Sequence, residues 1–63
     1  MNNAEKAVIY EECLRESDRL QRENSKIKSD YAGNIPPEFE QIINKNNYKI
    51  SVLVGRLESL FKD

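Results

Sequence analysis

Four basic side chains recur at spacings of four, three and four residues in the first half of the chain: Arg15, Arg19, Arg22 and Lys26. On an α-helix this spacing places all four on one face. Because a guanidinium group donates two parallel hydrogen bonds to a phosphate, such a pattern is typical of a phosphate-binding surface. We call these four residues the basic stripe, and its candidate ligands are RNA and a signalling nucleotide.

Acidic residues interrupt the basic stripe. Glu11 lies four residues before Arg15, and Asp18 lies four residues before Arg22, which favours ion pairs within one helix. Such pairs neutralise part of the stripe. A solvated helix face whose charges neutralise one another is therefore the simpler interpretation of the same residues.

The second half of the chain adds a looser basic set of Lys45, Lys49 and Arg56, with the ring of Tyr48 beside it. A tyrosine ring can stack on a nucleic-acid base, and surfaces that bind single strands carry several such rings. Tyr48 has no aromatic neighbour in the sequence, so an exposed or interface position is the alternative interpretation. These four residues complete the predicted ligand-binding set.

Chemistry beyond binding has few candidate residues. Cys13 is the only thiol, and the sequence contains no histidine to activate it as a nucleophile. Without histidine, one cysteine also cannot assemble a zinc site of three or four nitrogen and sulfur ligands. Glu12 and Glu16 lie one helical turn apart, but carboxylates on an outer helix face are usually solvated. We expect a non-enzymatic protein that holds no metal and no cofactor.

The composition sets the scale of the fold. The chain has 63 residues, ten basic and eleven acidic, which allows one small domain with a net charge of -1. A protein that coats nucleic acid needs a strong basic excess, and the near-neutral charge of this chain argues against that class of protein. A domain this small usually needs disulfides, a metal or oligomerisation, and here oligomerisation is the remaining option. Apolar runs such as 52–54 are too short to cross a bilayer, and the first residues lack a signal-peptide pattern, so we expect an intracellular protein.

One stretch rich in turn-forming residues divides the chain into two charged segments. Gly33 suits the left-handed conformation that closes a helix, Pro36 steers the preceding residue away from the helical region, and Pro37 suits a first helical turn. Asn2 or Asn3 suits an N-cap position. The sequence therefore predicts one helical-hairpin domain over 1–63, with a helix over about 4–31, a turn over 32–36 and a helix over about 37–61.

Apolar residues alternate at spacings of four and three along both predicted helices, which is a heptad pattern. The second helix carries the stronger seam, through Phe39, Ile43, Asn46, Ile50, Leu53, Leu57 and Leu60. The first carries a weaker one, through Tyr10, Cys13, Ser17, Leu20, Asn24, Ile27 and Tyr31. Gly33 and the two prolines exclude one continuous coiled coil, so we expect an all-α, two-helix antiparallel hairpin.

The register of this hairpin follows from the position of the turn. Residues at one level of an antiparallel hairpin have a constant sum of residue numbers, which is about 70 for a turn centred near Ile35. Asn24 then lies opposite Asn46. A buried asparagine is costly unless its amide is hydrogen-bonded, so the sequence predicts that this pair specifies the register.

The apolar surface is wider than the seam. Ile9, Leu14, Ile42, Val54 and Phe61 lie beside it, and a two-helix hairpin cannot cover them all. Ser51, Gly55 and Ser59 form a line of small residues at spacing four; Gly55 either lets another backbone approach or is a tolerated surface glycine. We predict an interface made by Ser51, Gly55, Ser59, Val54 and Phe61, and self-association into a four-helix bundle or a higher oligomer. A partner protein is the alternative cover.

Two resemblances follow from this layout. In length and arrangement the chain is similar to the plasmid-encoded RNA-binding hairpin Rop, a likeness of architecture only. The amphipathic first helix, the turn ending in Pro37-Glu38, and the closing pattern of Leu53, Arg56, Leu57 and Leu60 resemble short helical-hairpin proteins encoded by bacteriophages, including a family named after a crAss-like gut phage. That resemblance implies an accessory protein in the cytoplasm of a bacterial host cell.

The same resemblance implies a function in opposing host immunity. Small phage proteins of this type bind a host protein, or sequester an immune nucleotide signal between the helices of an oligomer. We therefore expect an anti-defence inhibitor that acts by binding. The alternatives are a Rop-like regulator that binds structured RNA, and a structural or assembly adaptor that docks a partner helix.

Overall fold

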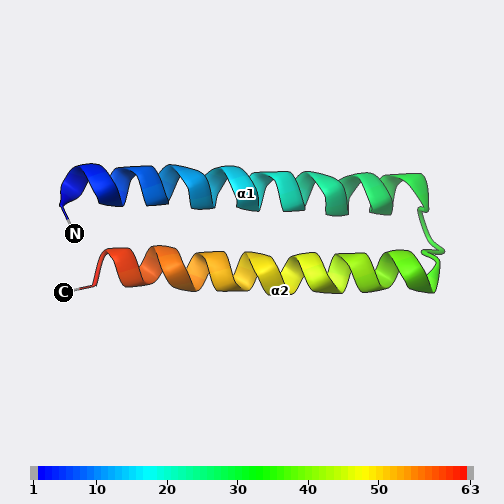
Figure 1. Cartoon of the computed structure of the whole chain (residues 1–63). Coiled ribbons are helices and arrows are strands. Elements are labelled where there is room, and N and C mark those ends of the chain that lie inside the picture. The colour runs from blue at the N-terminus through cyan, green and yellow to red at the C-terminus, as the bar shows by residue number, and fades with distance from the viewer. Residues whose placement is uncertain (1, 63) are drawn as a thin grey trace.

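The computed structural model describes residues 2–62 and folds them into two long helices joined by a short turn (Figure 1). α1 spans Asn3–Asp30 and α2 spans Pro37–Leu60, and they run in opposite directions side by side. All regular secondary structure between residues 2 and 62 is helical, so the predicted all-α hairpin is confirmed. The two ends of the predicted domain, Met1 and Asp63, lie outside the described residues.

Local sequence signals explain where the helices begin and end. The Oδ1 atom of Asn2 accepts a hydrogen bond from the backbone N–H of Glu5 at 2.8 Å, so Asn2 is the N-cap of α1. α1 ends at Asp30, one residue before the predicted limit, because Tyr31 leaves the helical region at φ -121° and ψ 42°. Gly33 then takes the left-handed conformation, at φ +85°.

Two prolines set the start of α2. Pro36 is extended, at φ -58° and ψ 147°, and Pro37 occupies the first turn, where the missing N–H of proline costs nothing. The carbonyl oxygen of Pro36 accepts hydrogen bonds from the N–H groups of Phe39 and Glu40, each at 3.0 Å. α2 ends at Leu60, one residue before the predicted limit.

The predicted seam forms the core between the helices. The buried residues all belong to it: Cys13, Leu20, Asn24, Ile27, Ile43, Asn46 and Leu60. Near the turn, the rings of Tyr31 and Phe39 stack with centroids 4.8 Å apart, as the register predicts. At the open end, the ring of Tyr10 packs edge-on against that of Phe61, with centroids 5.8 Å apart. Tyr10 stays 39% exposed because α2 ends at Leu60 and has no further turn to cover it.

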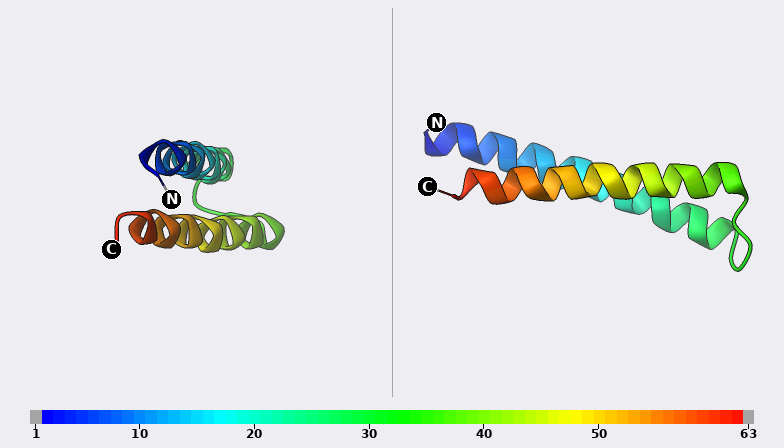
Figure 2. Two further views of the ribbon diagram at one scale, coloured as in Figure 1. Left: turned by 60° about the vertical axis from the view of Figure 1, so that its left-hand side comes forward. Right: turned by 90° about the horizontal axis from the view of Figure 1, so that it is seen from below.

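The hairpin is a rod of 46 × 15 × 13 Å, one helix pair wide. Figure 2 shows the two helices crossing at a shallow angle, and residues 2–62 form no second layer of structure on either side of them. Each helix therefore buries a single stripe of side chains, and most of its surface faces outward. Neither helix of the described chain contains a segment long and apolar enough to cross a membrane.

Two long flanks border the seam. The residues directly beside the seam on one side define the first flank: Ala7, Leu14, Gln21, Lys28, Glu40, Asn47, Val54 and Phe61. The residues beside the seam on the other side define the second flank: Ile9, Glu16, Glu23, Asp30, Ile42, Lys49 and Arg56. The first flank has one acidic and one basic residue, whereas charged residues dominate the second.

Candidate functional site

A polar cluster lies in the middle of the apolar seam. The Nδ2 atom of Asn46 donates hydrogen bonds to Oδ1 of Asn24 at 2.9 Å and to Oε1 of Glu23 at 2.7 Å. The Nδ2 atom of Asn24 in turn donates to Oδ1 of Asn47 at 3.0 Å. No fully buried side-chain nitrogen or oxygen among residues 2–62 lacks a partner. The two asparagines thus share a level, as the register predicts, and their amides are satisfied.

Sequence reasoning missed two members of this cluster. Glu23 precedes Asn24 in the chain and Asn47 follows Asn46, so each flanks a seam asparagine directly. That adjacency was the available signal, because residues beside the seam lie within reach of the opposite helix. Their side chains extend the buried pair to both flanks of the hairpin.

Ion pairs within α1 occupy half of the basic stripe. The guanidinium of Arg19 donates two hydrogen bonds to the carboxylate of Glu16, and Arg22 Nε lies 2.9 Å from Asp18 Oδ2. Of the two predicted pairs, the one between Asp18 and Arg22 is present. Within residues 2–62, Arg15 and Lys26 form no ion pair. Both remain exposed cations on the outer face of α1.

The pair between Arg19 and Glu16 also changes the acidity of the carboxyl group. The hydrogen bond from Arg19 lowers the pKa of Glu16 below its ordinary value of 4.5. Desolvation opposes this shift and raises the pKa, whereas the positive charges of Arg19 and then Lys49 lower it further. Lys49 of α2 therefore faces an acidic residue of α1 across the second flank.

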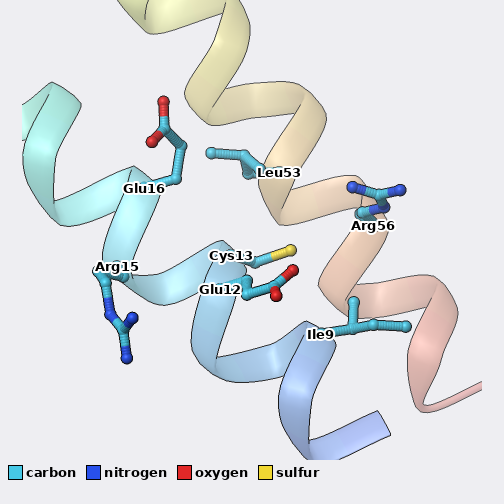
Figure 3. Close-up of a pocket in the computed structure, with 7 residues that line it drawn as sticks. All are labelled: Ile9, Glu12, Cys13, Arg15, Glu16, Leu53 and Arg56. Carbon is cyan, nitrogen blue, oxygen red and sulfur yellow. The ribbon is translucent and has the colours of Figure 1, made fainter. Parts of the chain in front are cut away.

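The largest charged hollow on the second flank holds about 410 Å³ (Figure 3). Its lining combines groups from both helices: Ile9, Glu12, Cys13, Arg15, Glu16, Leu53 and Arg56. In Figure 3, the side chain of Arg15 points away from α2, whereas Arg56 comes from α2 and lies across the hollow from Glu12. Glu12 and Glu16 thus accompany Arg56 around the hollow, and two carboxylates beside one guanidinium oppose the binding of a phosphate group. The hairpin by itself does not unite the basic stripe with Arg56.

Cys13 lies at the floor of this hollow, with its sulfur directed between the helices (Figure 3). The thiol is unpaired and only 2% of the residue is exposed. A buried cysteine in a seam position packs as a small apolar residue. Within residues 2–62, no group of three His, Cys, Asp or Glu is placed to hold a metal ion.

The looser basic set on α2 divides between two surfaces. Lys49 and Arg56 lie on the second flank near Glu16, whereas Lys45 is exposed on the outer face of α2. Tyr48 is 72% exposed and lines a shallow hollow of about 290 Å³ with Lys49 and Val52. No aromatic ring of the described chain stacks on Tyr48.

A hollow of about 560 Å³ with a mainly apolar lining opens beside the first flank near the ends of the helices. Its apolar lining comes from Ala7, Tyr10, Leu14 and Phe61, with Asn3, Lys6 and Glu11 as polar lining residues. Phe61 is 66% exposed, so its ring is largely unburied by the hairpin. We call this hollow the open-end groove.

The predicted interface does not form a single surface. Val54 and Phe61 lie on the first flank, whereas Ser59 lines a separate hollow with Ile9 and Arg56 on the second flank side. The hydroxyl of Ser59 donates to the carbonyl oxygen of Gly55 at 3.0 Å, so it bonds within its own helix. A Cβ added at Gly55 meets nothing within 4 Å, and no other part of the hairpin approaches this glycine.

Comparison with known proteins gives no match to a family model, a curated protein sequence or a solved structure.

Proposed function

We propose that this chain is a non-enzymatic binding protein whose working form is an oligomer of hairpins. The exposed apolar surface carries the proposal. Among residues 2–62, five apolar residues are buried, whereas large apolar side chains remain exposed at Val8, Tyr10, Leu14, Ile42, Tyr48, Val52, Val54 and Phe61. Isolated soluble domains rarely leave so much of their apolar content facing water, and contiguous patches mark interaction sites.

The class of activity comes from the resemblance to phage-encoded helical hairpins. We propose an anti-defence protein that inhibits a host component, or sequesters an immune nucleotide signal, in the cytoplasm of a bacterial host cell. The exposed cations at Arg15 and Lys26 support a phosphate-bearing ligand, because no carboxylate within residues 2–62 pairs with them. Such a ligand would bind to these cations on the outer faces of the hairpins, which stay exposed.

The open-end groove favours a second candidate, an assembly adaptor that docks a partner helix. Tyr10, Leu14 and Phe61 line this groove, and an amphipathic helix inserts side chains of this type into such a surface. A Rop-like regulator that binds structured RNA remains the third alternative. The net charge of -1 makes it the weakest of the three.

Native mass spectrometry of the protein, purified from a bacterial host, tests the proposal. We expect two or more copies per particle, together with a retained host protein or small phosphate-bearing molecule. Sedimentation over a range of concentrations checks the subunit number independently. A particle that is monomeric and carries no host component would contradict the proposed function.

Salt dependence then separates the ligand classes. Binding to RNA falls steeply as salt rises because counterions are released from the phosphate backbone. Docking on an apolar groove changes little over the same range. A titration at two salt concentrations therefore distinguishes the RNA regulator from the adaptor.

A further inference from the structure

The residues of the first flank change from apolar at the open end of the hairpin to polar and charged near the turn. Its eight residues are exposed and fall into pairs, one residue from each helix, at four levels seven residues apart: Ala7 with Phe61, Leu14 with Val54, Gln21 with Asn47, and Lys28 with Glu40. The hydrogen bond between Asn24 and Asn46 fixes these levels. From the open end to the turn, the four levels of the flank are therefore apolar, apolar, amide and oppositely charged.

A second copy of the chain fits this pattern in one orientation. A two-fold axis parallel to the long axis of the rod places α1 of one copy beside α2 of the second, at unchanged levels. Leu14 then meets Val54 of the second copy, and small Ala7 meets the large ring of Phe61. Lys28 meets Glu40 of the second copy, with opposite charges alternating around the axis.

The opposite orientation lacks this match. A two-fold axis across the rod places the two α1 helices side by side in opposite directions. Leu14 then lies near Gln21 of the second copy, and Ala7 lies near Lys28. Full overlap of the rods would bury apolar residues against polar ones, at a cost in desolvation.

The polar residues of the flank have bonding capacity left for a second copy. Within residues 2–62, neither Lys28 nor Glu40 takes part in an ion pair. Asn47 uses its Oδ1 atom to accept from Asn24, and its Nδ2 atom donates no hydrogen bond to another side chain of the described residues. That amide nitrogen can donate to Gln21 of the second copy.

The size of the flank also suits a dimer. A long face of the rod measures 46 by 15 Å, close to the roughly 800 Å² that each partner buries in a stable protein interface. Burial there would cover Leu14 and Val54, which are each 45% exposed in the single hairpin, and much of Phe61. Together with Ala7, these side chains make up the apolar half of the flank.

We infer that the first flank is the interface of a parallel dimer, in which two hairpins align turn to turn and form a four-helix bundle. This inference rests on the self-association proposed above and adds its surface, symmetry and register. The basic stripe stays on the outside of such a bundle, accessible to a ligand.

Distances between spin labels test the orientation. Two single-label variants, Asn34→Cys at the turn and Lys62→Cys at the open end, are each made with Cys13→Ala and checked for helicity. In the parallel dimer both label pairs lie within about 30 Å, twice the 15 Å width of the rod. Two distances near 46 Å, or a short distance only at the open end, would indicate an antiparallel dimer and overturn the inference.

A charge reversal tests the surface. Lys28→Glu places like charges at the turn-end level, so the dissociation constant of the dimer should rise at least about tenfold. Adding Glu40→Lys should restore association. Glu38→Lys, which reverses an exposed charge of α2 outside both flanks at the same end of the rod, is the matched control and should leave association unchanged. An unchanged dissociation constant for Lys28→Glu would overturn the inference. A wild-type chain that stays monomeric at all concentrations would overturn the proposed oligomer as well, whereas an antiparallel dimer would overturn the inference alone.

Discussion

The Nδ2 atom of Asn46 donates a hydrogen bond of 2.9 Å to Oδ1 of Asn24, across the helix interface and 22 positions away in the sequence. Shifting the hairpin by one heptad would place Asn24 opposite Phe39 or Leu53, where its amide would be buried against an apolar side chain. The pair therefore favours one register over its neighbours. The second acceptor of Asn46, Glu23, makes the two asparagines unequal.

That inequality gives the first prediction. Asn46→Leu removes the donor to the buried Oδ1 of Asn24 and should lower the free energy of unfolding by about 1–3 kcal/mol. Asn24→Leu should cost less, because Asn46 keeps its 2.7 Å bond to Glu23. The double Leu variant should be at least as stable as the better single variant, which makes the two effects non-additive. Urea unfolding at one fixed protein concentration measures all four chains, and additive losses would contradict the coupling.

The architecture was predictable because it depends on the backbone and on residue type. Spacings of four and three predict the seam, and Gly33, Pro36 and Pro37 allow only one place for the turn. The constant sum of residue numbers then gives the level of each seam residue. The predicted helix limits of 4–31 and 37–61 differ from the structure by one residue at three of the four ends, where helices fray.

The details of the candidate site were less predictable because they depend on flexible side chains. Arg19 lies within reach of carboxylates at several spacings, and the pairs it can form differ by a few tenths of a kcal/mol. The sequence therefore does not show that Glu16 is its partner. It also gives no sign that Arg15 points away from Arg56, because the heptad pattern specifies a helix face and not a rotamer.

The two glycines provide the second prediction, because they differ in conformation alone. A Cβ at Gly33 or at Gly55 meets nothing within 4 Å, but Gly33 has φ +85° and Gly55 is helical. Gly55→Ala should raise the free energy of unfolding by about 1 kcal/mol. Gly33→Ala should lower it by about 1 kcal/mol through left-handed strain. Thermal melting with sedimentation measures both; a smaller oligomer for Gly55→Ala would show instead that another copy packs on this glycine.

The third prediction concerns acid stability. Because Arg19 lowers the pKa of folded Glu16 below 4.5, their interaction stabilises the fold above the unfolded pKa and is lost as pH falls through the folded value. Arg19→Gln should raise the pKa of Glu16 toward its ordinary value while preserving the helix. An NMR titration of the Glu16 carboxyl carbon measures this shift. Arg15→Gln is the matched control and should leave this pKa unchanged; equal shifts in both variants would mean that Arg19 has no special role.

The last prediction tests the basic stripe. Changing Arg15, Arg19 and Arg22 together to Gln should preserve helicity and oligomer size, because Gln has nearly the same helix propensity as Arg. Binding to a phosphate-bearing ligand should fall, since each lost charge-assisted hydrogen bond is worth about 1.5–3 kcal/mol. The larger share should come from Arg15, because Arg19 and Arg22 already hold carboxylates of their own helix. Calorimetric titration with cyclic nucleotides and a short structured RNA compares Arg15→Gln with the Arg19→Gln, Arg22→Gln double variant. If the triple variant inhibits the host component as well as the wild-type chain does, the stripe is a solvated face, and the adaptor function becomes the better proposal.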